Sequence, residues 1–399
     1  MNYHDLSTNT LVIDGAPIAT PSGFIKAYKK DGSDRDVNYI AKRFAQLESE
    51  ADKIIDKIDG NIGKGSTTLE RGEVNTLRKF LFVVSYRNGH HSQQFVEERF
   101  DDATLQRIKE FQAEYGLGDI RSVWFFNLKN ILDSEHWEVA GNPRIFVADR
   151  LDYQIEHNWF HLGFFCTPAD SNFIFTGAMG VSEGSPIQDP ILRLTLDTMF
   201  GESRYWTGAQ SSTERTLCLS RSWALTPRLL VLLSNVGLAQ NQLSLNGIPT
   251  EPPYNIQESY FHDLQKIQSA VTCNPPLSTA ASYMLSAPIV TFTQEHHRLQ
   301  REFEQENRLD GKNIDTRVKD LITFQITKLT EEQSIRVNAL LLDHCGSNIV
   351  FVTAKSLREA VRRYARSARL DAREDRGVGI QILERKLAAE EAGQNKRPS

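Results

Sequence analysis

The sequence contains no run of eighteen or more apolar residues, so a membrane-spanning helix is not expected. Its opening stretch, MNYHDLSTNTLVIDG, has neither the basic start nor the apolar core of a secretory signal. Cysteine is scarce, and the four occur singly, which argues against a zinc ribbon, a CxxC redox pair or a disulfide framework; they are Cys166, Cys218, Cys273 and Cys345. We therefore expect a cytoplasmic protein with reduced thiols.

Three common signatures of enzyme chemistry are also missing: the GxSxG elbow, the phosphate-binding P-loop and a GxGxxG motif after a strand. Hydrolase, nucleotide triphosphatase and dinucleotide-binding functions therefore lack their usual motifs, and we expect no cofactor. The net charge of −5 is mild and by itself indicates no polyanionic partner. Any attraction to nucleic acid must come from uneven placement of charge along the chain.

The apolar fraction of 40% is enough to fill a core, and its spacing in the first part of the chain is helical. Apolar residues recur at steps of three and four over residues 37–59, and Gly60 ends that pattern. The same period predicts further helices over 69–87 and, more loosely, over 93–115. A mixed segment follows at 123–132, and a largely buried helix rich in aromatic residues is expected over 150–166.

After residue 166 the pattern changes to short apolar runs rich in β-forming residues, which predict strands of one sheet near residues 172, 217, 229, 322 and 349. Helices are expected over 294–308 and 331–345, and 237–292 is expected to be irregular. The predicted fold is α+β: a helical N-terminal half packed on a mixed sheet, with an arginine-rich helix near the C-terminus. We expect one domain over 1–370, with a helical part at 37–166 and a sheet-containing part at 167–370, and then a charged, flexible tail at 371–399.

The arginine-rich helix begins near Ser356 and has two stripes. Leu357, Val361, Tyr364 and Ala368 share a narrow apolar stripe. The second stripe is basic and holds Arg358, Arg362, Arg366 and Arg369; Arg363 lies beside it. Such a helix can pack by its apolar stripe and present guanidinium groups that grip phosphates bidentately, as in RNA. The alternative is an ordinary surface helix whose arginines pair with acidic groups of the same protein.

Three other features each have a functional and an ordinary interpretation. His157 and His161 are four residues apart, as in helical metal sites, but no third ligand is identifiable and no metal is expected. Glu183, in the glycine-rich stretch GVSEGSP, could be a catalytic carboxylate or simply a turn residue. Arg87 ends an apolar helical segment, where a cation either complements the helix dipole or has a functional role.

Six segments, taken in order, resemble a family described as domain of unknown function 4238, particularly its fungal members. They are MNYHDLSTNTLVI, RFAQLESEADKIIDKI, LRKFLFVVSYRN, FIFTGAMGVSEGSP, WALTPRLLVLLSN and FQITKLTEEQSIRVNALLLDHC. The resemblance covers most of the chain up to about residue 370 and retains Arg87, Glu183, Pro227 and Arg228. Two features differ: the His-His-aromatic-Pro opening of the family is absent, and Gly177 replaces an acidic residue.

Some fungal relatives resemble arginine-containing cyclodipeptide synthases, which take amino acids from aminoacyl-tRNAs and release a diketopiperazine for secondary metabolism. The resemblance implies that this chain is a cytoplasmic aminoacyltransferase that uses Arg-tRNA and needs no metal or other cofactor. The arginine helix would hold tRNA phosphates, which gives a salt-sensitive contact. Glu183 and Arg87 would serve catalysis, and Asp170 and Arg228 would bind substrate, with Asp170 or Glu183 pairing with the substrate guanidinium. Two alternatives remain: a non-enzymatic RNA- or protein-binding module, and a metal-dependent nuclease.

Overall fold

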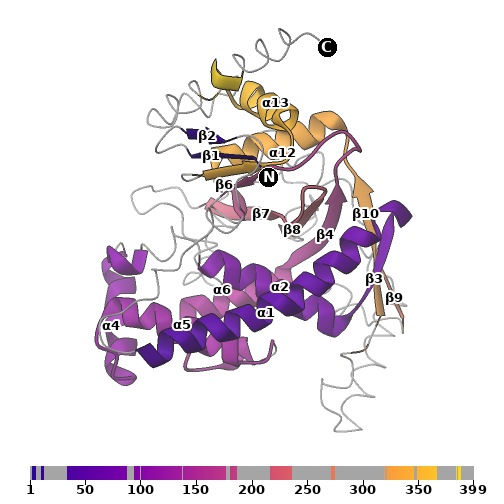
Figure 1. The fold of residues 1–399 in the computed structure, drawn as a ribbon. Helices are drawn as coiled ribbons and strands as arrows, with labels where there is room; N and C mark the ends of the chain where they lie inside the picture. Colours follow the sequence, from indigo (N-terminus) through magenta and orange to yellow (C-terminus); the bar gives the residue numbers. More distant parts are fainter. Residues whose placement is uncertain are drawn as a thin grey trace, which may run out of the picture.

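The computed structural model describes residues 2–5, 10–12, 34–87, 94–98, 100–136, 138–176, 180–186, 216–235, 271–274, 319, 321–345, 348–365, 383 and 385–387. These residues form an α+β fold with a helical N-terminal region and two sheets, and the fold class is the one that the sequence predicts (Figure 1). The helix predicted at 294–308 and most of the segment 237–292 lie outside the described residues.

The helical region consists of α1 (Asp34–Gly60), α2 (Arg71–Tyr86), α4 (Asp102–Glu114), α5 (Ile120–Asp133) and α6 (Val147–Trp159). Its helix starts depend on local chemistry. The Asp101 and Asp119 side chains accept hydrogen bonds from the first-turn amides of α4 and α5, while Glu70 and Glu73 form a reciprocal capping box at α2. One 3₁₀ turn, Ile62–Lys64, comes directly after α1, and a second, Val139–Gly141, lies between α5 and α6.

The larger sheet is mixed and runs in the order β3-β10-β4-β8-β7-β6, with β9 also paired to β10. Its strands are β3 (Ser66–Glu70), β4 (Phe160–Cys166), β6 (Val181–Pro186), β7 (Thr216–Ala224), β8 (Leu229–Asn235), β9 (Val271–Asn274) and β10 (Leu321–Lys328). The pair β10–β4 is parallel, and the other pairs are antiparallel.

The predicted single sheet is in fact two sheets. The strands near residues 172 and 349 are β5 (Phe175–Thr176) and β11 (Asn348–Phe351), which belong to a smaller sheet ordered β2-β1-β11-β5. Its other members are β1 (Asn2–Asp5) and β2 (Thr10–Val12). This pairing joins the start of the chain to a strand near its end, which periodicity alone cannot reveal.

The helix predicted over 150–166 is wrong in its second half, because α6 ends at Trp159 and β4 follows at once. β4 lies inside the sheet and is buried on both faces: Phe164 packs toward the helical layer and Phe165 packs in the opposite direction. A strand covered on both faces reads as a continuous apolar run, which periodicity cannot distinguish from a buried helix.

The larger sheet separates two hydrophobic cores. On one face, alternate residues such as Leu229 and Val231 pack with α1 and α2; on the other, Leu230 and Leu232 pack with α12 (Glu331–Asp343) and α13 (Ala354–Ala365). A third core joins α1, α2, α4, α5 and α6. Figure 1 shows α12 and α13 at the top of the view, the sheet below them and the helical region at the bottom.

The stretch 371–399, predicted to be a flexible tail, contributes Leu383 and Leu387 to the core around α12 and α13, where both are fully buried. The packed core therefore extends beyond residue 370 at these two positions. No helix among the described residues is long and apolar enough to cross a membrane.

Candidate functional site

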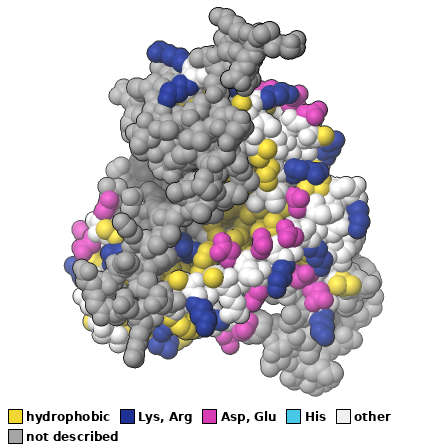
Figure 2. Space-filling model, in the orientation of Figure 1, with side chains coloured by type: hydrophobic (Ala, Val, Ile, Leu, Met, Phe, Trp, Pro, Cys, Tyr) yellow, Lys and Arg dark blue, Asp and Glu magenta, His cyan; other side chains and the backbone are white. Residues whose placement is uncertain are grey.

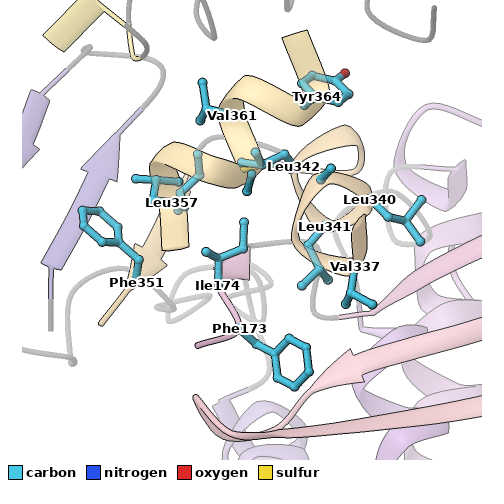
Figure 3. Packing of buried hydrophobic residues seen from close by; sticks show 14 of the residues in the cluster. Phe173, Ile174, Val337, Leu340, Leu341, Leu342, Phe351, Leu357, Val361 and Tyr364 are labelled. Atoms are coloured by element: carbon cyan, nitrogen blue, oxygen red, sulfur yellow. The ribbon is translucent and has the colours of Figure 1, made fainter. Parts of the chain in front are cut away.

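The arginine-rich helix α13 is anchored by three of the four residues in the predicted apolar stripe; the fourth, Ala368, lies outside the described residues. Leu357, Val361 and Tyr364 have no exposed surface, nor does Ala360, and Figure 3 shows the first three packed over α12 and the residues before β5. The hydroxyl of Tyr364 donates a hydrogen bond to Asp343 of α12 over 3.0 Å. Burying Leu357 and Val361 stabilises this packing by about 1.5–3 kcal/mol each. The helix is thus held in place with one face outward.

The basic residues of α13 differ in their surroundings. Arg362 and Arg363 are exposed, Arg358 is half-buried, and Arg366 and Arg369 lie outside the described residues. Arg363 forms an ion pair with Glu332 at 3.3 Å, and Lys355 pairs with Glu331 at 3.1 Å. In Figure 2, basic and acidic side chains lie near each other at the upper right of the molecule. Part of the basic charge is thus balanced by the neighbouring helix, as the ordinary interpretation requires.

Asp170 lies beside the start of α13. It is exposed in the loop between β4 and β5. The backbone N–H of Asn172 donates to the Ser356 hydroxyl of α13 over 3.1 Å, which ties this loop to the helix. The pKa of Lys355 is raised, mainly by its hydrogen bond to Glu331 and also, to a smaller extent, by the charge of Asp170.

Arg228 is exposed in the turn between β7 and β8, and this turn lies against the Asp170 loop. Its carbonyl oxygen accepts a hydrogen bond from the Thr167 N–H over 3.1 Å, and the Pro227 carbonyl accepts one from the Phe173 N–H over 2.8 Å. Asp170 and Arg228 therefore sit on two adjoining loops that share an end of the sheet with the start of α13.

Glu183 and Arg87 are placed elsewhere. Glu183 is in β6, where its Cα is paired with that of the buried Ser220 and the register shifts immediately after it; its side chain is outside the described residues. Arg87 is the residue after α2, and its guanidinium carbon lies 3.6 Å from the ring centroid of Phe44 on α1. This cation–π contact belongs to the helical layer, on the other side of the sheet from α13. Arg87 and Asp170 are therefore not brought together.

A buried charge cluster that no sequence motif indicates lies between α2, α6 and β7. Arg78 donates to three main-chain carbonyls at the end of α6, those of Glu156, His157 and Phe160, at 2.9–3.3 Å. Burial lowers the pKa of Arg78 to about 10, so it remains charged at neutral pH. The Glu156 carboxylate, which is fully buried, is paired with Arg221 of β7. Arg78 thus caps α6, and a buried ion pair joins α6 to the sheet.

A stack of three rings lies beside this cluster. The ring centroids of Tyr153 and His157 are 3.9 Å apart, and those of His157 and His136 are 4.3 Å apart. Nδ1 of His136 is 2.9 Å from the Tyr153 hydroxyl. Burial, reinforced by nearby cations, lowers the pKa of His136 to about 3, and it lowers the pKa of His157 well below its usual value. Burial also raises the pKa of Tyr153. Perturbed titratable groups gather in this way at functional sites more often than elsewhere.

The helical spacing suggested for His157 and His161 does not apply, because α6 ends between them and His161 belongs to β4. In the part of the chain that the structure describes, no group of three or more His, Cys, Asp or Glu residues is arranged to hold a metal ion. The sequence gives only one indication of the cluster of Arg78, Glu156 and Arg221: each of these charged residues lies within an apolar segment.

The comparison with known families identifies the family of the chain. Residues 25–355 match the family described as "Protein of unknown function (DUF4238)". The chain belongs to this family, which confirms that part of the resemblance. No curated protein and no solved structure matches the chain.

Proposed function

We propose that the chain is an aminoacyl-tRNA-dependent cyclodipeptide synthase that forms an arginine-containing diketopiperazine in fungal secondary metabolism. The observation that carries the proposal is the anchoring of α13, which is fully buried on one side while Arg362 and Arg363 are exposed on the other. Guanidinium groups on a fixed helix suit the phosphates of a tRNA acceptor stem, because they can make bidentate contacts.

The neighbourhood of α13 supports a substrate guanidinium close to the tRNA. Asp170 lies beside the start of the helix and offers a carboxylate for bidentate pairing with the arginyl side chain. Arg228, on the adjoining turn, offers a positive charge at the same end of the sheet. Glu183 is our candidate for a proton-accepting carboxylate, and Arg87 is a weaker candidate for catalysis because it is stacked on Phe44 in the helical layer.

The chemistry requires two ester aminolyses. The amine of one aminoacyl group attacks the ester carbonyl of the other; the C–N bond forms, the C–O bond to the tRNA breaks, and the tRNA oxygen leaves as a hydroxyl with the proton lost by the amine. The same step, repeated within the dipeptidyl ester, closes the ring. Because the esters are already activated, these steps draw on no nucleotide or redox cofactor.

The direct test is to incubate the purified chain with arginine, the other amino acids, total tRNA and synthetases, and to search for a diketopiperazine by mass spectrometry. We expect a product that contains arginine and that disappears after ribonuclease treatment. Absence of product with every partner amino acid would refute the synthase.

The tRNA contact is tested separately with the double variant Arg362→Ala/Arg363→Ala. Its matched control is Arg107→Ala/Lys109→Ala, which removes two exposed cations from α4. The α13 variant should bind tRNA more weakly and lower the slope of log K against log salt by about one unit for each phosphate that is no longer bound, whereas the control should keep the slope. Equal slopes in both variants would mean that α13 is an ordinary surface helix.

A second candidate, a non-enzymatic RNA- or protein-binding module, is favoured by the same exposed arginines, Arg362 and Arg363, on the anchored helix α13. It predicts salt-sensitive RNA retention without turnover. Glu183→Gln separates the two, because it should abolish product formation by a synthase that uses this carboxylate but leave binding by a module unchanged.

A further inference from the structure

The ion pairs between α12 and α13 involve cations on the same surface as the proposed tRNA contact. Nζ of Lys355 lies 3.1 Å from a carboxylate oxygen of Glu331, and Nη1 of Arg363 lies 3.3 Å from one of Glu332. The four side chains are 45–56% exposed, so solvent and other anions can reach both pairs. An RNA phosphate that binds Lys355 or Arg363 must therefore replace a carboxylate of the protein itself.

The two helices do not depend on these pairs for their positions. Leu357 and Val361 of α13 share one buried core with Leu340 of α12, as Figure 3 shows, and the Tyr364 hydroxyl donates to Asp343. Exposed ion pairs add little stability beside such a core. The cations of α13 can therefore exchange their partners while the helix stays packed on α12.

The carboxylates keep favourable interactions when the cations leave them. Glu331 and Glu332 lie in the first turn of α12, where the helix dipole favours negative charge. Glu332 also lies 3.3 Å from Arg336, one turn later in the same helix. Exchange of Lys355 and Arg363 onto another anion therefore leaves neither carboxylate as an isolated charge.

Phosphates of a nucleic acid can compete with these carboxylates. A guanidinium group binds a phosphate through two parallel hydrogen bonds, and a nucleic acid releases condensed counterions when its phosphates are neutralised. A carboxylate of the same protein releases no such counterions. RNA can therefore displace Glu331 and Glu332, but its net affinity is lowered by the interactions that are broken.

We propose that Glu331 and Glu332 are internal competitors of RNA: they occupy Lys355 and Arg363 in the free protein and are displaced by the phosphates of bound tRNA. The inference rests on the tRNA contact of α13 proposed above, and it adds Lys355 to that contact. The competition lowers the affinity for tRNA, which suits a synthase that must release two tRNA molecules for each product.

The Glu331–Lys355 pair is the one to test, with fluorescence anisotropy of labelled total tRNA at one fixed salt concentration. Glu331→Gln should bind tRNA about two- to fivefold more tightly than the wild type, the range expected when one exposed ion pair no longer has to be broken. The matched control is Glu48→Gln, which removes an exposed carboxylate from α1, on the other side of the larger sheet. It should change the affinity by less than about 1.5-fold, because salt screens distant charges.

A double-mutant cycle separates competition from simple repulsion between Glu331 and RNA. In a Lys355→Met background the cation of the pair is gone, so Glu331→Gln removes only the repulsion. The gain in affinity should then be smaller than in the wild-type background by at least about twofold.

The outcomes distinguish the competition from the tRNA contact itself. If the wild type binds tRNA but Glu331→Gln binds no more tightly, or if the gain is equal in both backgrounds, the competition is overturned and the contact remains. If neither the wild type nor any variant binds tRNA, the contact is refuted, and the proposed synthase and the competition are refuted with it.

Discussion

Acidification should destabilise the chain through His136 in a way that can be calculated from its pKa. The folded-state pKa of about 3 lies below the ordinary value of 6.5, so the unfolded chain binds a proton that the folded chain does not. The free energy of unfolding therefore falls as the pH drops from about 6.5 towards 3, at about 1.4 kcal/mol per pH unit. Between about pH 7 and pH 5 the loss from His136 alone is about 2 kcal/mol.

His136→Gln isolates this contribution, because glutamine does not titrate. The variant loses the hydrogen bond to Tyr153, at a cost of about 0.5–1.5 kcal/mol at neutral pH, but its stability should fall about 2 kcal/mol less than that of the wild type on acidification. Urea denaturation, monitored by tryptophan fluorescence, measures the free energy of unfolding at neutral pH and its change on acidification. His344→Gln should retain the wild-type pH dependence. Parallel stability curves for wild type and His136→Gln would refute a neutral, buried His136.

Three substitutions test other parts of the fold by the same denaturation assay. Gly180→Ala should be strongly destabilising, because φ is +128° and an added Cβ would lie 2.4 Å from Nε1 of Trp223; a serine at the exposed Gly118 is a tolerated control. Leu357→Ala should lower the free energy of unfolding by about 2–5 kcal/mol, because it leaves a cavity under α13. A decrease below about 1 kcal/mol would mean that α13 is not anchored there. Arg78→Met should cost about 3–5 kcal/mol, because it leaves Glu156 in a buried cluster with one cation fewer and the last carbonyls of α6 uncapped; an unchanged midpoint would contradict that role.

Several helices could be predicted because they are amphipathic and have clear ends. The apolar period over 37–59 corresponds to α1, and the helix predicted over 331–345 corresponds to α12, which Thr330 and Gln333 cap. The apolar stripe of α13 was likewise readable, since Leu357, Val361 and Tyr364 repeat at helical spacing and are buried.

The features that could not be predicted depend on partners distant in sequence. The five residues of β3, STTLE, have no apolar alternation and are a strand because β10 pairs with them. Arg78 and Glu156 are buried only because α2 crosses the end of α6. The candidate site was affected in the same way: Asp170 and Arg228 come together through main-chain hydrogen bonds between two loops, for which residue type carries no signal.

The position of β10 in the larger sheet has a consequence for synthesis of the chain. Its first half pairs with β3 and β9, and its second half pairs with β4, so one strand near the end of the sequence closes edges formed by strands near the beginning and middle. During synthesis, the edges of β3 and β4 therefore stay unpaired until Leu321 and the residues after it have been made. Fragments that end before this strand would expose open edges and should aggregate, so shorter versions of the protein are best designed to retain it.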